Sequence, residues 1–350
     1  MKAAVLGEFG LIAHLAEVIA SEERAASLGA AAPGPAGTPP ARLLLGIGDD
    51  AAVWQLGDVL ELATTDTLVE RVHFLPQRTP WRDLGWKALA VNLSDIAAMG
   101  GIPLYALITL GLPPDAEVEH LTDLYRGMLE AAHTYGARLV GGDIVRSQVF
   151  FLTVALHGVA AGAGYPEGVL RRAAARPGEV VAVTGSLGAS AAGLEVLRSG
   201  RPLSDEAAAT LLREAHLRPR PRLAEGQALL RAGVRCAMDI SDGLLADLSK
   251  LCAASGVAAQ VELKQVPVLP AVRQHFPAWQ SLALSGGEDY ELLFTAPAAI
   301  LAELQRQAAF PVTAIGTIAA GTPGQVTLVD AAGEPVPWQN GGWDHLARET

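Results

Sequence analysis

Aspartates that follow glycines or stand beside hydroxyl side chains are the residues whose types and spacing suggest chemistry in this chain. Two such segments lie close together, Gly46-Ile47-Gly48-Asp49-Asp50 and Thr64-Thr65-Asp66. Further aspartates come at wide intervals, each where a strand or helix is predicted to end: Asp95, Asp143, Asp239 and Asp242. Carboxylates brought together in a fold repel one another and resist desolvation unless a cation lies among them. We therefore predict that they hold several magnesium ions, and that the ions hold a nucleotide triphosphate.

Oxygen ligands of this kind suit Mg²⁺, which prefers near-octahedral geometry and keeps several waters. Zinc or copper would call for histidines or cysteines, which these segments lack. A site rich in aspartate and poor in lysine neutralises a polyphosphate through metal ions, and in phosphoryl transfer the protein mainly aligns the reactants and neutralises charge. No Ser-His-Asp or Cys-His arrangement suggests itself in the sequence. We therefore assign no residue as a covalent nucleophile and expect direct transfer.

Composition limits the partners of the chain. It has 350 residues, 50% hydrophobic and 18% charged, so we expect a globular protein of two domains. The 26 Lys and Arg against 37 Asp and Glu give a formal charge of -11, which argues against nucleic acid and against an anionic membrane surface as partners. Neither a membrane span nor a signal peptide is predicted. Cys236 and Cys252 lack metal-site spacing, so we expect buried thiols in a cytoplasmic protein.

The hydrophobic pattern predicts helices that alternate with strands. Helices are predicted over residues 8–23, 81–98, 116–135, 204–215, 221–232 and 297–308. Strands are predicted over residues 43–45, 59–64, 104–110, 138–140, 150–159, 180–183, 235–240, 282–284, 290–295, 312–318 and 325–329. The segment from Ala25 to Ala41 is rich in Ala, Gly and Pro and is predicted to be a flexible surface loop.

This alternation predicts an α/β (α+β) fold with two domains. The run of small residues from Ala160 to Gly164 is a plausible boundary between them. We place an N-terminal domain with a mixed sheet and helices at residues 1–160, where the metal and the nucleotide would bind. A C-terminal α/β domain at residues 161–350 would complete the site.

Asp95 has an unusual position in the predicted helix over residues 81–98. It falls on the otherwise apolar face, and it falls in the last turn, where the helix dipole disfavours an anion. Two penalties at one residue indicate a compensating cation or another partner. The alternative is an aspartate that turns aside to cap a neighbouring loop.

Three later segments place acidic side chains next to glycines: Gly141-Gly142-Asp143, Asp239-Ile240-Ser241-Asp242-Gly243 and Ser285-Gly286-Gly287-Glu288-Asp289. Glycines let a backbone approach a ligand closely while the carboxylate points at it. Ser241 or Asp242 alone has a second interpretation, as the N-cap of the next helix. The glycine-rich turn at residues 184–189 lacks the lysine of a phosphate-binding loop, so we expect it to pack a strand on a helix.

Three other side chains have both a structural and a functional interpretation. His73 follows Asp66 closely enough for a substrate contact, although a lone histidine is usually structural. Arg172 is either a solvated surface charge or a bidentate phosphate contact. Trp343 follows two glycines, and it is either edge packing or a flat platform for an aromatic substrate.

Taken together, these motifs resemble the thiamine-monophosphate kinase family, in the superfamily that includes aminoimidazole ribonucleotide synthetase and selenophosphate synthetase. The resemblance runs from Gly7-Glu8-Phe9 to Trp343-Asp344-His345. Its motifs are GIGDDAAV at 46–53, TTDTLVERVHF at 64–74, KALAVNLSDIAAMG at 87–100, GGD at 141–143, DISDGL at 239–244 and SGGEDYEL at 285–292. Two features depart from the family pattern: the loop over residues 25–41 is longer than typical, and Trp343 stands where a Tyr is also expected.

The resemblance implies a homodimer in which the first-domain sheets pair between subunits, with ATP and thiamine monophosphate bound between the domains. The positions that match metal sites are Asp50, Thr64, Thr65, Asp66, Asp95, Asp143, Asp239 and Asp242. Those that match nucleotide contacts are Gly142, Asp143, Arg172 and Ser241, and those that match substrate contacts are His73, Glu288 and Trp343. The implied reaction is in-line attack of the substrate phosphate on the γ-phosphorus of ATP, giving thiamine diphosphate and ADP.

Two alternatives remain open at this point. One is a related ATP-dependent synthetase, although the selenophosphate-forming members typically carry a reactive Cys or selenocysteine near the N-terminus and residues 1–45 contain no Cys. The other is a sensor that binds magnesium and nucleotide without catalysis.

Overall fold

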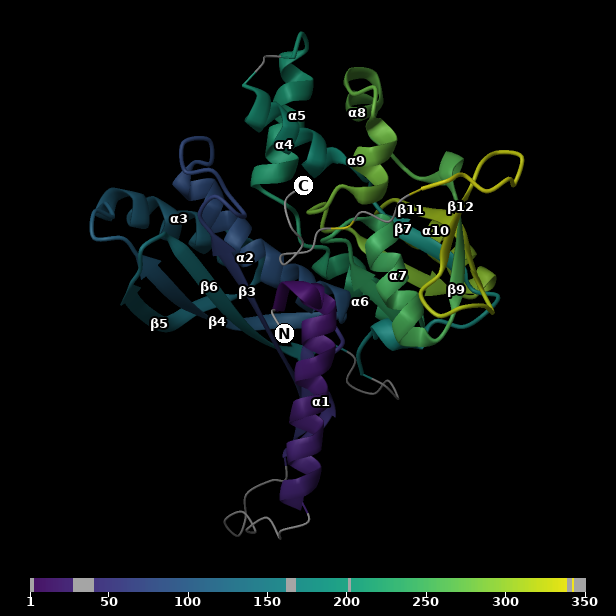
Figure 1. Cartoon of the computed structure of the whole chain (residues 1–350), viewed down its shortest axis with the longest axis horizontal. Coiled ribbons are helices and arrows are strands. Elements are labelled where there is room, and N and C mark those ends of the chain that lie inside the picture. Colours follow the sequence, from purple (N-terminus) through teal and green to yellow (C-terminus); the bar gives the residue numbers. More distant parts are fainter. Residues whose placement is uncertain (1–2, 28–40, 162–167, 201–202, 339–341, 343–350) are drawn as a thin grey trace.

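The structure is a computed structural model that describes residues 3–27, 41–161, 168–200, 203–338 and 342. Two six-stranded sheets form the framework, one from each half of the chain. Figure 1 shows the first sheet on the left and the second on the right, with helix α1 projecting below them. Both sheets are mixed and both carry helices, as the predicted two-domain fold requires.

The first sheet has the strand order β1-β2-β3-β6-β4-β5. Its strands are β1 (Ala41–Leu45), β2 (Ala52–Leu56), β3 (Val59–Val69), β4 (Gly101–Leu112), β5 (Arg138–Arg146) and β6 (Phe151–Ala160). Neighbouring strands are antiparallel except β4 and β5, which are parallel. One face of the sheet buries Leu62, Ile108, Leu110, Leu152 and Val154. The other face remains partly exposed, with Tyr105 and Leu107 about half accessible.

Helices α2 (Trp81–Ala98) and α3 (Val118–Tyr135) belong to the same half of the chain. The two helices touch through their backbones, because a Cβ atom on Gly85 would lie 1.9 Å from the carbonyl oxygen of Leu124, and one on Gly127 would lie 1.7 Å from that of Arg82. α3 ends where Gly136 takes a left-handed conformation with φ of 81°. The described part of the chain begins with a 3₁₀ turn (Ala3–Val5) and helix α1 (Gly7–Ser27).

The second sheet has the order β12-β9-β11-β7-β10-β8. Its strands are β7 (Val180–Thr184), β8 (Cys236–Asp239), β9 (Ala258–Glu262), β10 (Leu292–Ala296), β11 (Val312–Ala319) and β12 (Val326–Val329). The helices of this half are α4 (Ala189–Ser199), α5 (Glu206–Leu217), α6 (Leu223–Arg231), α7 (Leu244–Ser255), α8 (Pro270–His275), α9 (Trp279–Ser285) and α10 (Ala298–Gln307). Short 3₁₀ turns occupy Arg172–Ala174 and Leu263–Gln265.

Helix α2 joins the two halves. It packs on β3, β4 and β6 of the first sheet and also meets β8, α5 and α6 of the second half. Its contact with α6 is again backbone to backbone, since a Cβ on Gly226 would lie 2.0 Å from the carbonyl oxygen of Ala97. The helix is therefore buried nearly all round, and polar residues such as Lys87, Asn92 and Ser94 are buried with it.

Several predicted elements differ from the structure. β3 continues to Val69, so Thr65 and Asp66 lie within a strand and not after its end. Gly141-Gly142-Asp143 likewise lies within β5. Both segments are strands because they pair with neighbouring strands. The strand predicted over 282–284 is wrong: these residues lie in α9 and are buried there, and a short apolar run does not distinguish a buried helix from a strand. Strands β2 and β9 and helix α8 were not predicted. Helix α1 extends to Ser27, and residues 28–40 of the predicted loop lie outside the described part.

The first sheet ends with β6 at Ala160 and the second begins with β7 at Val180. The division into residues 1–160 and 161–350 remains a prediction. Among the helices that the structure describes, none has the length and apolar character needed to span a membrane.

Candidate active site

Three carboxylates from distant parts of the chain converge where the two halves meet. Asp50 follows β1, Asp95 lies in the last turn of α2, and Asp239 ends β8. One carboxylate oxygen from each lies within 4.8 Å of the others. The convergence predicted from the sequence is thus present for these three residues, and Asp95 does not turn away to cap a loop.

Hydroxyl side chains hold two of these carboxylates in place. Thr64 Oγ1 donates to Asp95 Oδ2 at 2.5 Å, and Ser94 Oγ donates to Asp239 Oδ2 at 2.6 Å. The third carboxylate, Asp50, forms an ion pair with the Arg172 guanidinium through Oδ1, while its buried Oδ2 has no hydrogen-bond partner among the described residues. A bare buried carboxylate oxygen beside two more carboxylates is a donor set that fits a hard divalent cation.

Burial and mutual repulsion raise the pKa values of these carboxyls in the metal-free chain. Burial first, and then the neighbouring aspartates, raise the pKa of Asp95 and of Asp239 well above the ordinary value. Burial also raises the pKa of Asp50, although Arg172 opposes it. The pKa of Asp49 rises from 3.8 to about 7 through burial and then through Asp50. A divalent cation among these oxygens would lower the pKa values again, because it favours the charged carboxylates.

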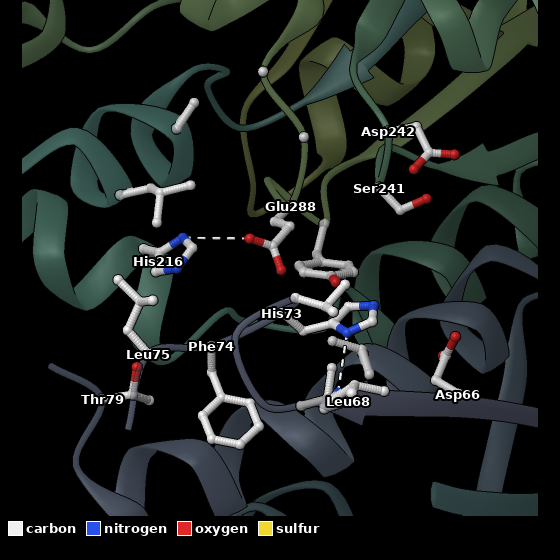
Figure 2. A pocket seen from close by; sticks show the side chains of 18 of the residues that line it. Asp66, Leu68, His73, Phe74, Leu75, Thr79, His216, Ser241, Asp242 and Glu288 are labelled. Atoms are coloured by element: carbon white, nitrogen blue, oxygen red, sulfur yellow. Dashed lines mark hydrogen bonds and ion pairs between the residues drawn. The ribbon is translucent and has the colours of Figure 1, made fainter. Parts of the chain in front are cut away.

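A cavity of about 950 Å³ opens beside the carboxylate cluster. Figure 2 shows side chains from both halves of the chain that point into it. The sequence-predicted site residues that line it are Thr65, Asp66, His73, Asp95, Asp239, Ser241, Asp242 and Glu288. Apolar side chains also line the cavity, and Figure 2 shows two of them, Phe74 and Leu75, on the opposite side of the view from Asp66 and Asp242. One end is therefore acidic, and the other can hold an apolar or aromatic group.

The segment Asp239–Gly243 shapes the acidic end of the cavity. The Oδ2 atom of Asp247 accepts hydrogen bonds from the N–H groups of Ser241, Asp242 and Gly243, at 3.0–3.1 Å. α7 begins after Gly243 without a side-chain cap, so the interpretation of Ser241 or Asp242 as its N-cap is wrong. The Asp242 carboxylate instead pairs with Lys250 and lines the cavity.

The remaining predicted site residues that the structure describes do not line the cavity. Asp50, Thr64 and Arg172 lie at the carboxylate cluster beside it, whereas Gly142 and Asp143 lie elsewhere. Gly142 and Asp143 are exposed on β5, the outermost strand, and the Asp143 carboxylate accepts a hydrogen bond from the N–H of Ile144 at 2.9 Å. Strand pairing alone requires glycine at 142, because a Cβ there would lie 1.8 Å from the carbonyl oxygen of Ile108. Trp343 lies outside the residues that the structure describes.

Comparison with known proteins identifies the family. Residues 48–160 match the N-terminal domain of AIR synthase related protein, and residues 176–329 match its C-terminal domain. The chain belongs to the AIR synthase related family. Among curated relatives, the thiamine-monophosphate kinase of Escherichia coli (strain K12) is 41% identical over 87% of this chain and 92% of its own length. That of Bacillus subtilis (strain 168) is 36% identical over 81% of this chain and 88% of its own.

A solved structure, AaThiL complexed with AMPPCP and TMP, has the same fold. It is 33% identical in sequence, each chain covers 99% of the other, and the TM-score is 0.81. AMPPCP and TMP are thus bound by a relative that aligns with this chain over nearly the whole length of both proteins.

The structure of this family member adds four cavity or site residues that the sequence reasoning missed: Lys87, Ser94, His216 and Tyr290. Lys87 and Ser94 are buried polar residues of α2, and a lysine on an otherwise apolar helical face was the available signal. Tyr290 lies in the motif SGGEDYEL with a left-handed backbone, φ of 51°. Burial first, and then Glu288, raise the pKa of its phenol, so it remains a hydrogen-bond donor at neutral pH.

We predict that Asp95→Asn stabilises the metal-free protein at pH 8. Folding raises the pKa values of the clustered carboxyls, so the folded protein loses stability as the pH rises. For Asp49 this loss takes place between pH 3.8, its ordinary pKa, and about pH 7, its pKa in the folded chain. Removal of one charge relieves the repulsion and should raise the free energy of unfolding by about 1–2 kcal/mol at pH 8, and by less at pH 5.

Thermal unfolding in the presence of a chelator measures this difference. Asp58→Asn is the matched control, since it makes the same chemical change at an exposed residue and should leave the melting temperature unchanged. Addition of Mg²⁺ should stabilise the unaltered chain more than Asp95→Asn. A metal-free Asp95→Asn protein that melts below the unaltered chain at pH 8 would contradict the account of the cluster.

Proposed function

We propose that this chain transfers the γ-phosphoryl group of ATP to thiamine monophosphate, giving thiamine diphosphate and ADP, the last step in making that cofactor. The convergence of Asp50, Asp95 and Asp239, of which the last two line the cavity, is the observation that carries this proposal. The relatives named thiamine-monophosphate kinase, and the relative complexed with AMPPCP and TMP, support the choice of substrates.

Magnesium ions fit the acidic end of the cavity. The residues that would hold them are Asp50, Thr64, Thr65, Asp66, Asp95, Asp239 and Asp242, all of which offer oxygen ligands. When bound, Mg²⁺ would neutralise the negative charge of the phosphoryl oxygens. Ser241 and Arg172 stand beside these carboxylates and supply hydrogen-bond donors for the nucleotide phosphates.

The opposite end of the cavity suits the organic part of thiamine monophosphate. His73 accepts a hydrogen bond at Nδ1 from the N–H of Val69 at 3.0 Å, and Figure 2 shows it near Glu288. The Glu288 carboxylate supplies an acceptor for an amine or a counter-charge for a cation, and thiamine carries both groups. We propose Trp343 as a further contact with the aromatic ring.

Transfer proceeds directly from donor to acceptor. Cys236 and Cys252 are free and buried, and burial raises their thiol pKa values to about 12 and about 11, so neither is a nucleophile at neutral pH. The role of the chain is to orient the two phosphates and exclude water. Two free thiols accord with the reducing cytoplasm, where we place the reaction.

We further propose a homodimer formed through the exposed face of the first sheet. Ile102, Tyr105, Leu107 and Val145 are each between 39% and 51% exposed on β4 and β5, and exposed apolar side chains on one face of a sheet favour a protein interface there. Asp143 lies on this face, in β5. Strands β6 and β4 separate β5 from β3, whose residues line the cavity. At about 4.8 Å per strand, that separation is roughly 14 Å.

The distance suggests that Gly142 and Asp143 serve the site of the partner subunit. A two-fold dimer brings the same face of both copies together, so β5 of one subunit can approach the cavity of the other. This arrangement would account for the metal-site and nucleotide roles that the family resemblance implies for two residues outside the cavity of their own chain.

Turnover tests the reaction. Purified protein with MgATP and thiamine monophosphate should yield thiamine diphosphate and ADP in equal amounts, measured by mass spectrometry. Asp239→Asn should lower kcat by about a hundredfold or more, because it removes a charge that aligns the transferred group, while the exposed control Asp330→Asn should not. Unchanged thiamine monophosphate at high concentrations of the unaltered protein would refute the kinase function and favour a nucleotide sensor.

Mixed dimers test the placement of Asp143. Asp143→Asn and Asp95→Asn should each be inactive alone. If Asp143 acts in the partner's site, a hybrid dimer has one intact site, and random mixing should restore about a quarter of the unaltered activity. Unfolding and refolding an equimolar mixture, followed by an activity assay, measures the recovery. No recovery despite hybrid formation would show that both aspartates act in the same subunit.

A further inference from the structure

Lys87 is a charged side chain placed inside the protein. It belongs to α2, its side chain is 2% exposed, and it is absent from the residues that line the cavity. A buried ammonium is costly unless it is paired. Its Nζ atom lies 2.8 Å from Oε1 of Glu288, which belongs to the other half of the chain and does line the cavity.

His216 of α5 completes the group. Its Nε2 atom lies 3.4 Å from Lys87 Nζ, and its Nδ1 atom lies 3.4 Å from Glu288 Oε2 and 3.1 Å from Ser190 Oγ. Burial first, and then Lys87, lower the pKa of the imidazole to about 3, so the ring is neutral. Because an ammonium only donates, Nε2 must accept from Lys87, and the ring proton must be on Nδ1, facing Glu288 and Ser190.

The Glu288 carboxylate is thus held at both oxygens. Lys87 contacts Oε1 and His216 contacts Oε2, as Figure 2 shows for the histidine. The backbone is fixed as well, since Glu288 has a left-handed φ of 66° and its N–H donates to the carbonyl of Ser241 at 2.8 Å. A non-glycine residue in this conformation is strained and persists only where its surroundings hold it, often at a binding site.

We propose that Lys87 and His216 are positioning residues that hold the Glu288 carboxylate in one orientation toward the cavity, where it binds the amine or cationic ring of the phosphate acceptor. The inference rests on the proposed function. Neither residue needs to touch the nucleotide, because the aspartate cluster at the other end of the cavity forms that part of the site. Selection of the acceptor therefore depends on a lysine in the first half of the chain and a glutamate in the second.

Steady-state kinetics of Lys87→Met test this role. We expect the KM for thiamine monophosphate to rise at least tenfold, because Glu288 loses the partner that orients it, while the KM for ATP changes less than threefold. Arg222→Met is the matched control: Arg222 also pairs with a buried carboxylate, that of Glu291 at 2.5 Å, but neither residue lines the cavity. It should lower the melting temperature and leave both KM values unchanged.

A double variant separates positioning from folding. Glu288→Gln alone should raise the KM for thiamine monophosphate, and Lys87→Met/Glu288→Gln should match it within about twofold, since Lys87 acts only through Glu288. The double variant removes both buried charges and gives a result even if Lys87→Met does not fold. An unchanged KM in a folded Lys87→Met protein, or a double variant clearly worse than Glu288→Gln, would overturn the inference. Lack of turnover by the unaltered chain would instead overturn the proposed function and this inference with it.

Discussion

Mutual repulsion among buried carboxylates is the constraint on which this site depends. Asp50, Asp95 and Asp239 come from a loop, a helix end and a strand end, and no local sequence feature brings them within 4.8 Å of one another. Two hydroxyls and one guanidinium partly compensate their charges, and burial raises their pKa values. The fold therefore keeps an arrangement of carboxylates that is destabilising by itself and that a bound divalent cation would stabilise.

Helix α2 makes this arrangement possible. It is buried against both sheets, and at its close glycine contacts with α3 and α6 there is no room for a Cβ atom. Along this one helix, Lys87 faces Glu288, Ser94 donates to Asp239, and Asp95 joins the carboxylates. A rigid helix thus links the acidic end of the cavity to the end proposed for the organic substrate, so a shift in its packing would disturb both.

The sequence predicted the parts of this picture that depend on local pattern. The helix over residues 81–98 was confirmed with its bounds, and Asp95 was recognised because its charge conflicts with both the apolar face and the helix dipole. The family resemblance was confirmed. Patterns could not show that Asp66 lies inside a long strand or that residues 282–284 form a helix, because pairing partners and burial decide those states.

Tertiary contacts likewise determine what Lys87 and Asp143 do. Nothing near Lys87 in sequence indicates an ion pair with Glu288, and the motif around Asp143 does not reveal that its strand is at the edge of the sheet. Such roles arise only once distant segments are placed, and in the case of Asp143 once a second subunit is considered.

The most direct measurement of the central claim is anomalous diffraction from crystals grown with Mn²⁺ in place of Mg²⁺ and a non-hydrolysable ATP analogue. The account predicts anomalous peaks at about 2.1 Å from carboxylate oxygens of Asp50, Asp95 and Asp239, each also bound to a phosphate oxygen or water. A bound nucleotide with no anomalous peak at these three carboxylates would contradict it.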